Sequence, residues 1–181
     1  MEYCMTDYDY SILEHYGYEQ YQKVANDLIA YMSECEIKDL NEYYFPHIPQ
    51  RVYLKSCIAR SYQYFECHYE FNEDMRLVGG LYSGKSNIDY VWHAWVEFID
   101  NDREIVFDGV LQRFYDKHKY YGKFQCIPIN EYHEDALEEF EYEEIAEEIE
   151  TKCNKVKHEM ALNGYYDKPI EEIREYALTK V

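Results

Sequence analysis

Apolar side chains recur every three or four residues in two N-terminal segments, which is the spacing of the buried face of an amphipathic helix. The first segment is YEQYQKVANDLIAYMSECE, residues 18–36, with apolar positions at Tyr21, Ala25, Leu28 and Met32. The second is SCIARSYQYFECHYEF, residues 56–71, with apolar positions at Ile58, Tyr62, Phe65 and Tyr69. Ser56 is a suitable N-cap for this second helix, which places Cys57 in the first helical turn.

Three extended runs follow, namely MRLVGGLY (75–82), YVWHAWVEFI (90–99) and REIVFDG (103–109). They are rich in aliphatic and aromatic residues, as strands are. Asp100-Asn101-Asp102, between the last two runs, is typical of a turn, so these runs are expected to form an antiparallel hairpin. Trp95 is expected to pack beneath the hairpin, and Trp92, on the opposite face of its strand, to belong to the core.

The helical spacing returns after about Glu134 and predicts one long helix. Its apolar positions are Ile145, Ile149, Cys153, Val156 and Met160. Asn163-Gly164 is expected to end it, and Pro169 to open a short final helix. We therefore expect one α+β domain over residues 1–181, with a core at about 50–130 and an acidic helical part at about 131–181.

The net charge of the chain restricts the kinds of macromolecule that it is expected to bind. The net charge is −19, which argues against binding to nucleic acid or to an anionic membrane surface. Residues 131–150 contain eleven Asp or Glu and no Lys or Arg. That stretch predicts a solvated acidic helix face, with an acidic docking surface as the alternative.

Cysteine usage and the N-terminal sequence bear on location. Six cysteines include no C-x-x-C pair, and His118 and His133 have no partners at ligand spacing, so neither a metal nor another cofactor is expected. The N-terminal MEYCMTDYDY predicts no signal peptide, and no apolar stretch approaches the ~18 residues of a transmembrane helix. We expect a cytoplasmic protein with reduced thiols.

Two motifs compete within residues 79–98. Gly79 and the sequence Gly84-Lys85-Ser86 match a phosphate-binding P-loop, which requires a helix directly afterwards. The following SNIDYVWHAWVEF alternates like a strand instead, so nucleotide binding is the weakest hypothesis. In the second motif, HAWVE, a hairpin turn centred between Asp100 and Asn101 places His93 directly opposite Asp108. A carboxylate at that distance would orient the imidazole.

Cys57 adds a third group to this pair. A thiol in the first helical turn lies at the positive end of the helix dipole, which favours the nucleophilic thiolate. Cys57, His93 and Asp108 would then form a triad for attack on an acyl carbon. Gln50, seven residues before Cys57, is a candidate to donate to the oxyanion together with the Cys57 backbone N–H, or is an ordinary loop residue.

The three blocks CIARS, HAWVEF and IVFDG resemble the Cys, His and Asp blocks of the transglutaminase-like cysteine peptidase superfamily, nearest to bacterial leader-peptidase-type members that process lasso peptides. His93 follows Cys57 by 36 residues and Asp108 follows His93 by 15, as in the compact core of that superfamily. The resemblance covers about Ser56 to Gly109. It implies a papain-like α+β core in which the nucleophile helix packs on a small antiparallel sheet, here with added N- and C-terminal helices.

Two functions remain from these observations. The first is acyl transfer (proteolysis, deamidation or transamidation) on a peptide or protein, possibly a basic one, with Cys57 as nucleophile, His93 as base and acid, and Asp108 as orienter. The second is a non-catalytic acidic binding or inhibitor protein on the same fold, because a triad of this kind does not by itself guarantee turnover.

Overall fold

The computed structural model describes residues 17–72, 74–83 and 90–180, an α+β arrangement around a five-stranded antiparallel sheet. The strands, in the order β4-β3-β2-β1-β5, are β1 (Arg76–Tyr82), β2 (Val91–Asp100), β3 (Arg103–Asp108), β4 (Arg113–Asp116) and β5 (Ile127–Tyr132). The helices are α2 (Tyr18–Met32), η1 (Ser33–Cys35), α3 (Lys38–Tyr44), α4 (Cys57–His68), η2 (Tyr69–Phe71), α5 (Lys117–Phe124), α6 (Glu134–Glu139), α7 (Tyr142–Leu162) and α8 (Ile170–Leu178). The expected α+β class is confirmed.

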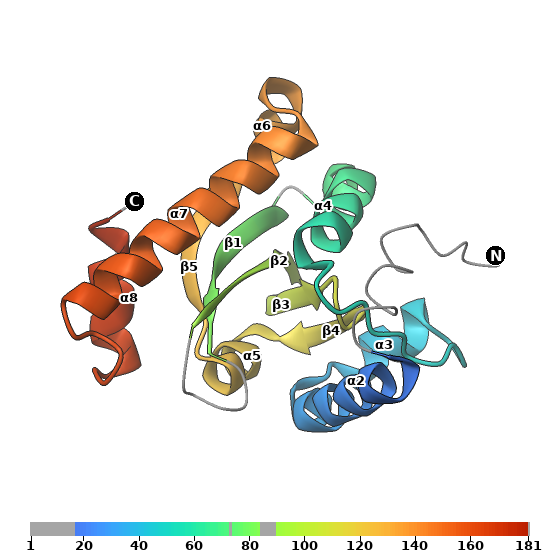
Figure 1. Cartoon of the computed structure of the whole chain (residues 1–181). Coiled ribbons are helices and arrows are strands. Elements are labelled where there is room, and N and C mark those ends of the chain that lie inside the picture. The colour runs from blue at the N-terminus through green and yellow to red at the C-terminus, as the bar shows by residue number, and fades with distance from the viewer. Residues whose placement is uncertain (1–16, 73, 84–89, 181) are drawn as a thin grey trace.

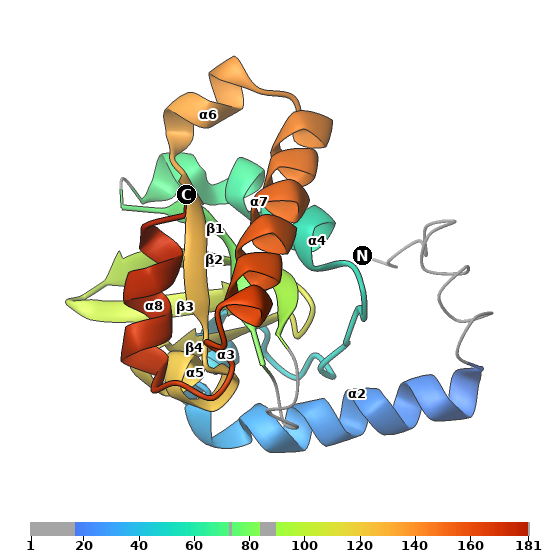
Figure 2. The same ribbon diagram turned by 60° about the vertical axis from the view of Figure 1, so that its left-hand side comes forward.

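Helices cover both faces of the sheet. On one face, α4 packs against β2 and α7 crosses β1 and β5 (Figure 1). The turned view shows α7 and α4 on one side of the sheet and α8 and α5 on the other (Figure 2). Apolar side chains of both layers join one hydrophobic cluster, in which Trp95, Phe65 and Tyr120 are among the largest fully buried members.

The helices predicted over residues 18–36 and 56–71 are confirmed as α2 and α4. Cys57 is the first residue of α4 and Ser56 occupies the N-cap position, although the Ser56 side chain makes no capping hydrogen bond. The single long helix expected from Glu134 is wrong, because the backbone is extended at Phe140 and separates α6 from α7. A capping box between Glu141 and Glu144 starts α7 afresh.

The β2–β3 hairpin exists, but its register differs from the prediction by two residues. Asp100 pairs with Arg103, and the ladder ends at Val96 and Phe107. The turn residues are therefore Asn101 and Asp102, both with positive φ, as the tight two-residue hairpin turn requires. Because the shift is even, His93 and Asp108 keep the same face of the sheet but are diagonal neighbours rather than direct partners.

The first glycine of the P-loop pattern has a packing role. Gly79 lies inside β1, where it pairs with Ala94 of β2 and Asn130 of β5. A Cβ at Gly79 would come within 2.7 Å of Ile149 on α7, so the absence of a side chain lets the helix approach the sheet. Gly84, Lys85 and Ser86 lie outside the described residues, and the next described element is strand β2, not a helix.

Candidate active site

The three residues of the predicted triad come from three elements and meet at one pocket. Cys57 opens α4, His93 lies in β2 and Asp108 ends β3. All three line a pocket of about 640 Å³, although each side chain is nearly buried. Two residues before Cys57, Lys55 has a φ of 64°, a conformation that costs energy for a residue with a side chain. This bend directs the chain into the helix that presents the thiol.

His93 and Asp108 are hydrogen-bonded to each other. The Nε2 atom of His93 lies 3.2 Å from Oδ2 of Asp108, and the Tyr120 hydroxyl, 3.2 Å from Nε2, donates to the same Oδ2 over 2.6 Å. The other carboxylate oxygen, Oδ1, accepts from the backbone N–H groups of Val110 (2.8 Å) and Leu111 (2.9 Å). Asp108 is thus fixed on both oxygens, and so fixes the imidazole.

This network sets the charges of the site. Burial alone would lower the pKa of His93, but the charge and hydrogen bond of Asp108, followed by those of Cys57, raise that pKa to about 10. Burial opposes ionisation of Asp108, yet His93, Tyr120 and the Leu111 N–H hold the pKa of its carboxyl below the usual range. At neutral pH the pair is an imidazolium and a carboxylate. Because Nε2 faces Asp108, the ring nitrogen left for the Cys57 thiol is Nδ1.

Other residues of the HAWVE motif help to hold the His93 imidazole in place. Residues 93, 95 and 97 share one face of β2, and the Trp95 ring stacks beside His93 with centroids 5.9 Å apart. The indole N–H of Trp95 donates to Glu97 over 2.8 Å. Glu97 in turn bonds Arg76 of β1 and Lys117 of α5, each at 2.7 Å, and accepts from Tyr121. Alternate residues of the motif thus form a row of contacting side chains, which ends at the ion pairs of the buried Glu97 carboxylate.

Helix α4, which begins with Cys57, packs on the sheet where β3 stops pairing with β2. Ser61 of α4 donates from its hydroxyl to the Ala94 carbonyl oxygen over 2.9 Å, beyond the end of the ladder. Gly109 follows β3 directly, and a Cβ there would lie 2.6 Å from the Ser61 backbone nitrogen. The close approach of α4 to the end of β3 therefore requires glycine at this position.

Gln50 is not brought to the site. Its side-chain amide donates to the Leu111 carbonyl oxygen (2.9 Å) and the Tyr115 hydroxyl (3.3 Å), and Gln50 is not among the residues lining the Cys57 pocket. In this arrangement both amide hydrogens are used, and none remains for an oxyanion. Besides His93, the side chains with N–H donors that do line the pocket are Lys55, Trp92, Asn154 and Lys157.

Sequence reasoning missed several residues around the triad. Tyr120 binds both His93 and Asp108, and the Tyr82 ring lies 4.7 Å from the imidazole, centroid to centroid. Burial raises the pKa of both phenols, so they stay neutral. Trp92, expected in the core, is only partly buried and lines the Cys57 pocket. Alternation along the strand correctly placed Trp92 on the face opposite Trp95 but did not show that it borders a pocket, and no sequence signal linked Tyr120 to Asp108.

Other kinds of site find little support in the described part of the chain. Its five cysteines, Cys35, Cys57, Cys67, Cys126 and Cys153, are free thiols. No group of three or more His, Cys, Asp or Glu side chains among the described residues is arranged to hold a metal ion. None of the described helices combines the length and the apolarity needed to cross a membrane.

Comparison of the chain with protein-family models, with curated proteins and with solved structures finds no match. The geometry of the residues above is therefore what bears on function.

Proposed function

We propose that the protein is a cysteine-nucleophile acyl transferase that acts on a peptide or protein by proteolysis, deamidation or transamidation. The observation that carries the proposal is the lining of one pocket by Cys57, His93 and Asp108, with His93 hydrogen-bonded to Asp108. The arrangement agrees with a transglutaminase-like or papain-like core, in which a nucleophile helix meets a small antiparallel sheet.

The raised pKa of His93 supplies the charged imidazolium that the proposed chemistry needs beside the Cys57 sulfur. The Cys57 sulfur would attack the substrate carbonyl carbon, and the electrons of the C=O bond would move to oxygen. On collapse, the C–N bond breaks and the imidazolium gives its proton to the leaving amine, which leaves a thioester on Cys57. Neutral His93 then takes a proton from water or from an acceptor amine as it attacks the thioester, and the thiolate is regenerated.

The protein supplies donors for the oxyanion without a cofactor. The first N–H groups of a helix have no partners within the helix, and that of Cys57 begins α4. Asn154 or Lys157, on the α7 side of the pocket, takes the place proposed for Gln50 in the sequence. A neutral substrate carbonyl gains most from these donors when negative charge develops on its oxygen.

Competitive alkylation tests the proposal. With limiting iodoacetamide at pH 7, we expect Cys57 to react about tenfold or more faster than Cys67, although Cys57 is 5% exposed and Cys67 lies on the surface. His93→Ala should slow labelling of Cys57 and leave that of Cys67 unchanged, measured by peptide mass spectrometry. Equal rates for the two thiols in the parent protein, or a stoichiometric binding partner without any Cys57-dependent turnover, would favour the non-catalytic alternative.

A further inference from the structure

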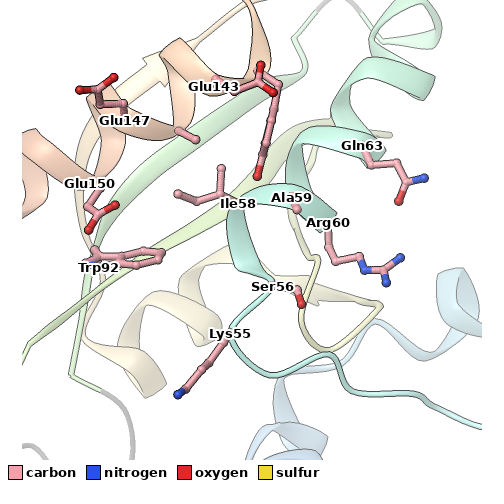
Figure 3. Close-up of a pocket in the computed structure, with 12 residues that line it drawn as sticks. Lys55, Ser56, Ile58, Ala59, Arg60, Gln63, Trp92, Glu143, Glu147 and Glu150 are labelled. Carbon is pink, nitrogen blue, oxygen red and sulfur yellow. The ribbon is translucent and has the colours of Figure 1, made fainter. Parts of the chain in front are cut away.

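A second pocket, of about 720 Å³, lies between α4 and α7. Its lining residues are Lys55, Ser56, Ile58, Ala59, Arg60, Gln63, Trp92, Tyr142, Glu143, Ala146, Glu147 and Glu150, and most are labelled in Figure 3. We call it the acidic groove, because three glutamates of α7 form one wall. The opposite wall is the first turns of α4, the helix that carries Cys57.

The acidic groove adjoins the Cys57 pocket. Lys55 and Trp92 line both, and the two neighbours of Cys57 in sequence, Ser56 and Ile58, line the groove. One face of α7 runs past both: Glu143, Glu147 and Glu150 border the groove, and Asn154 and Lys157, at the same three- and four-residue spacing, border the Cys57 pocket. An extended peptide whose carbonyl reaches Cys57 can therefore place a nearby side chain in the groove.

The groove has the chemistry of a site for a cationic side chain with an apolar stem. In Figure 3 the Glu150 carboxylate points toward the Trp92 ring, while Ile58 lies beside them. A carboxylate and an indole face both attract an ammonium or guanidinium group, and the apolar wall suits the methylene stem. Among the described residues neither Glu147 nor Glu150 forms an ion pair, and Lys152 on the same helix pairs with Glu148 instead, so no described Lys or Arg occupies this wall.

The two cationic residues of the lining, Lys55 and Arg60, point away from the glutamates of α7 (Figure 3). The Arg60 guanidinium lies 4.1 Å from the centre of the Tyr53 ring, and in Figure 3 it points away from α7. Lys55 extends away from α7 in the same view, at the end of the groove nearest to the Cys57 pocket.

Ser56 gives an independent sign of a missing ligand. Its Oγ is buried and has no hydrogen-bond partner among the described residues, although Ser56 stands at the N-cap of α4. A buried hydroxyl without a partner destabilises the protein, because it has lost its hydrogen bonds to water and gained none in exchange. Rotation about χ1 would offer this hydroxyl to the backbone of a peptide lying between the acidic groove and Cys57.

We propose that the acidic groove is a specificity subsite that takes a lysine or arginine side chain of the peptide substrate, bound between Glu150 and Trp92. This inference rests on the proposed cysteine chemistry, because the subsite is defined by its distance from the reacting carbonyl. The basic residue would lie within a few positions of the bond that is cut or exchanged.

Two series of alkylating tripeptides test the subsite, one with an acyloxymethyl ketone at the C-terminus and one with an iodoacetyl group at the N-terminus. In both, the Cys57 sulfur bonds to the reactive carbon as carboxylate or iodide leaves. Lys, Met or Glu is placed in turn at each position, and the second-order rate of Cys57 modification is measured. In at least one position we expect Lys to react about tenfold faster than Met, and Glu more slowly than Met.

Matched variants separate the subsite from general charge. Glu150→Gln should remove most of the preference for Lys, whereas Glu175→Gln, an equal change of charge at an exposed position of α8, should keep it. Glu175→Gln should leave the rate with plain iodoacetamide unchanged, and the peptide rates of each variant are expressed relative to its own iodoacetamide rate. If iodoacetamide prefers Cys57 but Lys, Met and Glu peptides react alike at every position, the subsite is wrong and the proposed function stands. If iodoacetamide does not prefer Cys57, the proposed function itself fails.

Discussion

At the scale of single residues, the charge state of His93 depends on one carboxylate. Asp108 is held by two backbone N–H groups and by Tyr120, so it cannot turn away from the imidazole without losing these bonds. A free histidine is mostly neutral at pH 7, whereas a histidine held by a buried carboxylate stays charged. The orienting and the electrostatic roles of Asp108 therefore coincide.

Replacement of Asp108 by asparagine should separate these roles. Asp108→Asn removes the negative charge that raises the pKa of His93, and burial, which acts in the opposite direction, should then bring that pKa from about 10 to its usual 6.5 or below. The measurement is an NMR titration of the His93 imidazole from pH 5 to 11. Cys57→Ala should lower the same pKa less, because Cys57 contributes after Asp108. A His93 pKa that stays near 10 in Asp108→Asn would contradict the assignment of the pair.

The raised pKa of His93 also makes the free energy of unfolding depend on pH. His93 has a higher pKa in the folded protein than in the unfolded chain, so its contribution to stability is complete below pH 6.5 and is lost as pH rises towards 10. The free energy of unfolding of the parent should therefore fall across that alkaline range more steeply than that of Asp108→Asn, as measured by urea denaturation at several pH values.

At the scale of elements, the site depends on how closely α4 approaches the end of β3. Gly109→Ala should force these elements apart, because the added Cβ would lie 2.6 Å from the Ser61 nitrogen and 2.7 Å from its Oγ. We expect a loss of about 1–3 kcal/mol in the free energy of unfolding. Labelling of Cys57 should also slow, because the thiol moves with α4 relative to His93.

Gly122 provides the control for Gly109. It lies within α5, and a Cβ there would meet no atom within 4 Å. Gly122→Ala should stabilise the protein by about 0.5–1 kcal/mol, because alanine favours helix. If Gly109→Ala were as stable as the parent, the tight packing of α4 on the end of β3 would be wrong.

Most of the elements that the sequence could predict have a regular apolar period, and α8, expected from Pro169, is the exception. Residues 18–36, 56–71 and the three runs 75–82, 90–99 and 103–109 gave a correct helix or strand each, because each buries one face over several turns or pleats. Helices α3 and α5 and strands β4 and β5 were not predicted, since all are short and β5 contains Pro128. Local pattern is weak in such segments, and tertiary contacts decide them.

Local sequence pattern also predicted the β2–β3 hairpin of the site only in part. Sequence placed His93 and Asp108 on one face, since alternation is local, but missed the register by two residues, because Asn101-Asp102 rather than Asp100-Asn101 adopts positive φ. Gln50 was judged from its distance along the chain, whereas its contacts are with Leu111 and Tyr115, about sixty residues away. Residues linked only through the fold, such as Tyr120, could not be found from spacing.

At the scale of the whole molecule, acidic groups dominate, with 37 Asp or Glu against 18 Lys or Arg. Most carboxylates repel one another at neutral pH, and mild acid should relieve this repulsion. The buried carboxylate of Glu97 is different, because its negative charge stabilises the fold and its protonation should weaken it. It is 2% exposed and joins β1, β2 and α5 through Arg76, Trp95 and Lys117. Burial opposes its ionisation, but these hydrogen bonds and charges hold its pKa below the usual value.

Glu97 should therefore contribute to the acid limit of stability. A carboxyl whose pKa is depressed by folding stabilises the protein fully above its unfolded value of 4.5, and loses this contribution as pH falls through the folded value. We expect Glu97→Gln to cost about 2–3 kcal/mol at pH 7, since it removes charge-assisted hydrogen bonds to two cations. The difference between variant and parent should shrink as pH is lowered from 5 to 3.

Glu104→Gln, which removes an exposed carboxylate near the same Lys117, should stay within about 0.5 kcal/mol of the parent throughout. Urea denaturation at pH 7, 5 and 3.5 measures all three proteins. A constant difference between Glu97→Gln and the parent over that range would mean that the charge of Glu97 does not hold β1, β2 and α5 together.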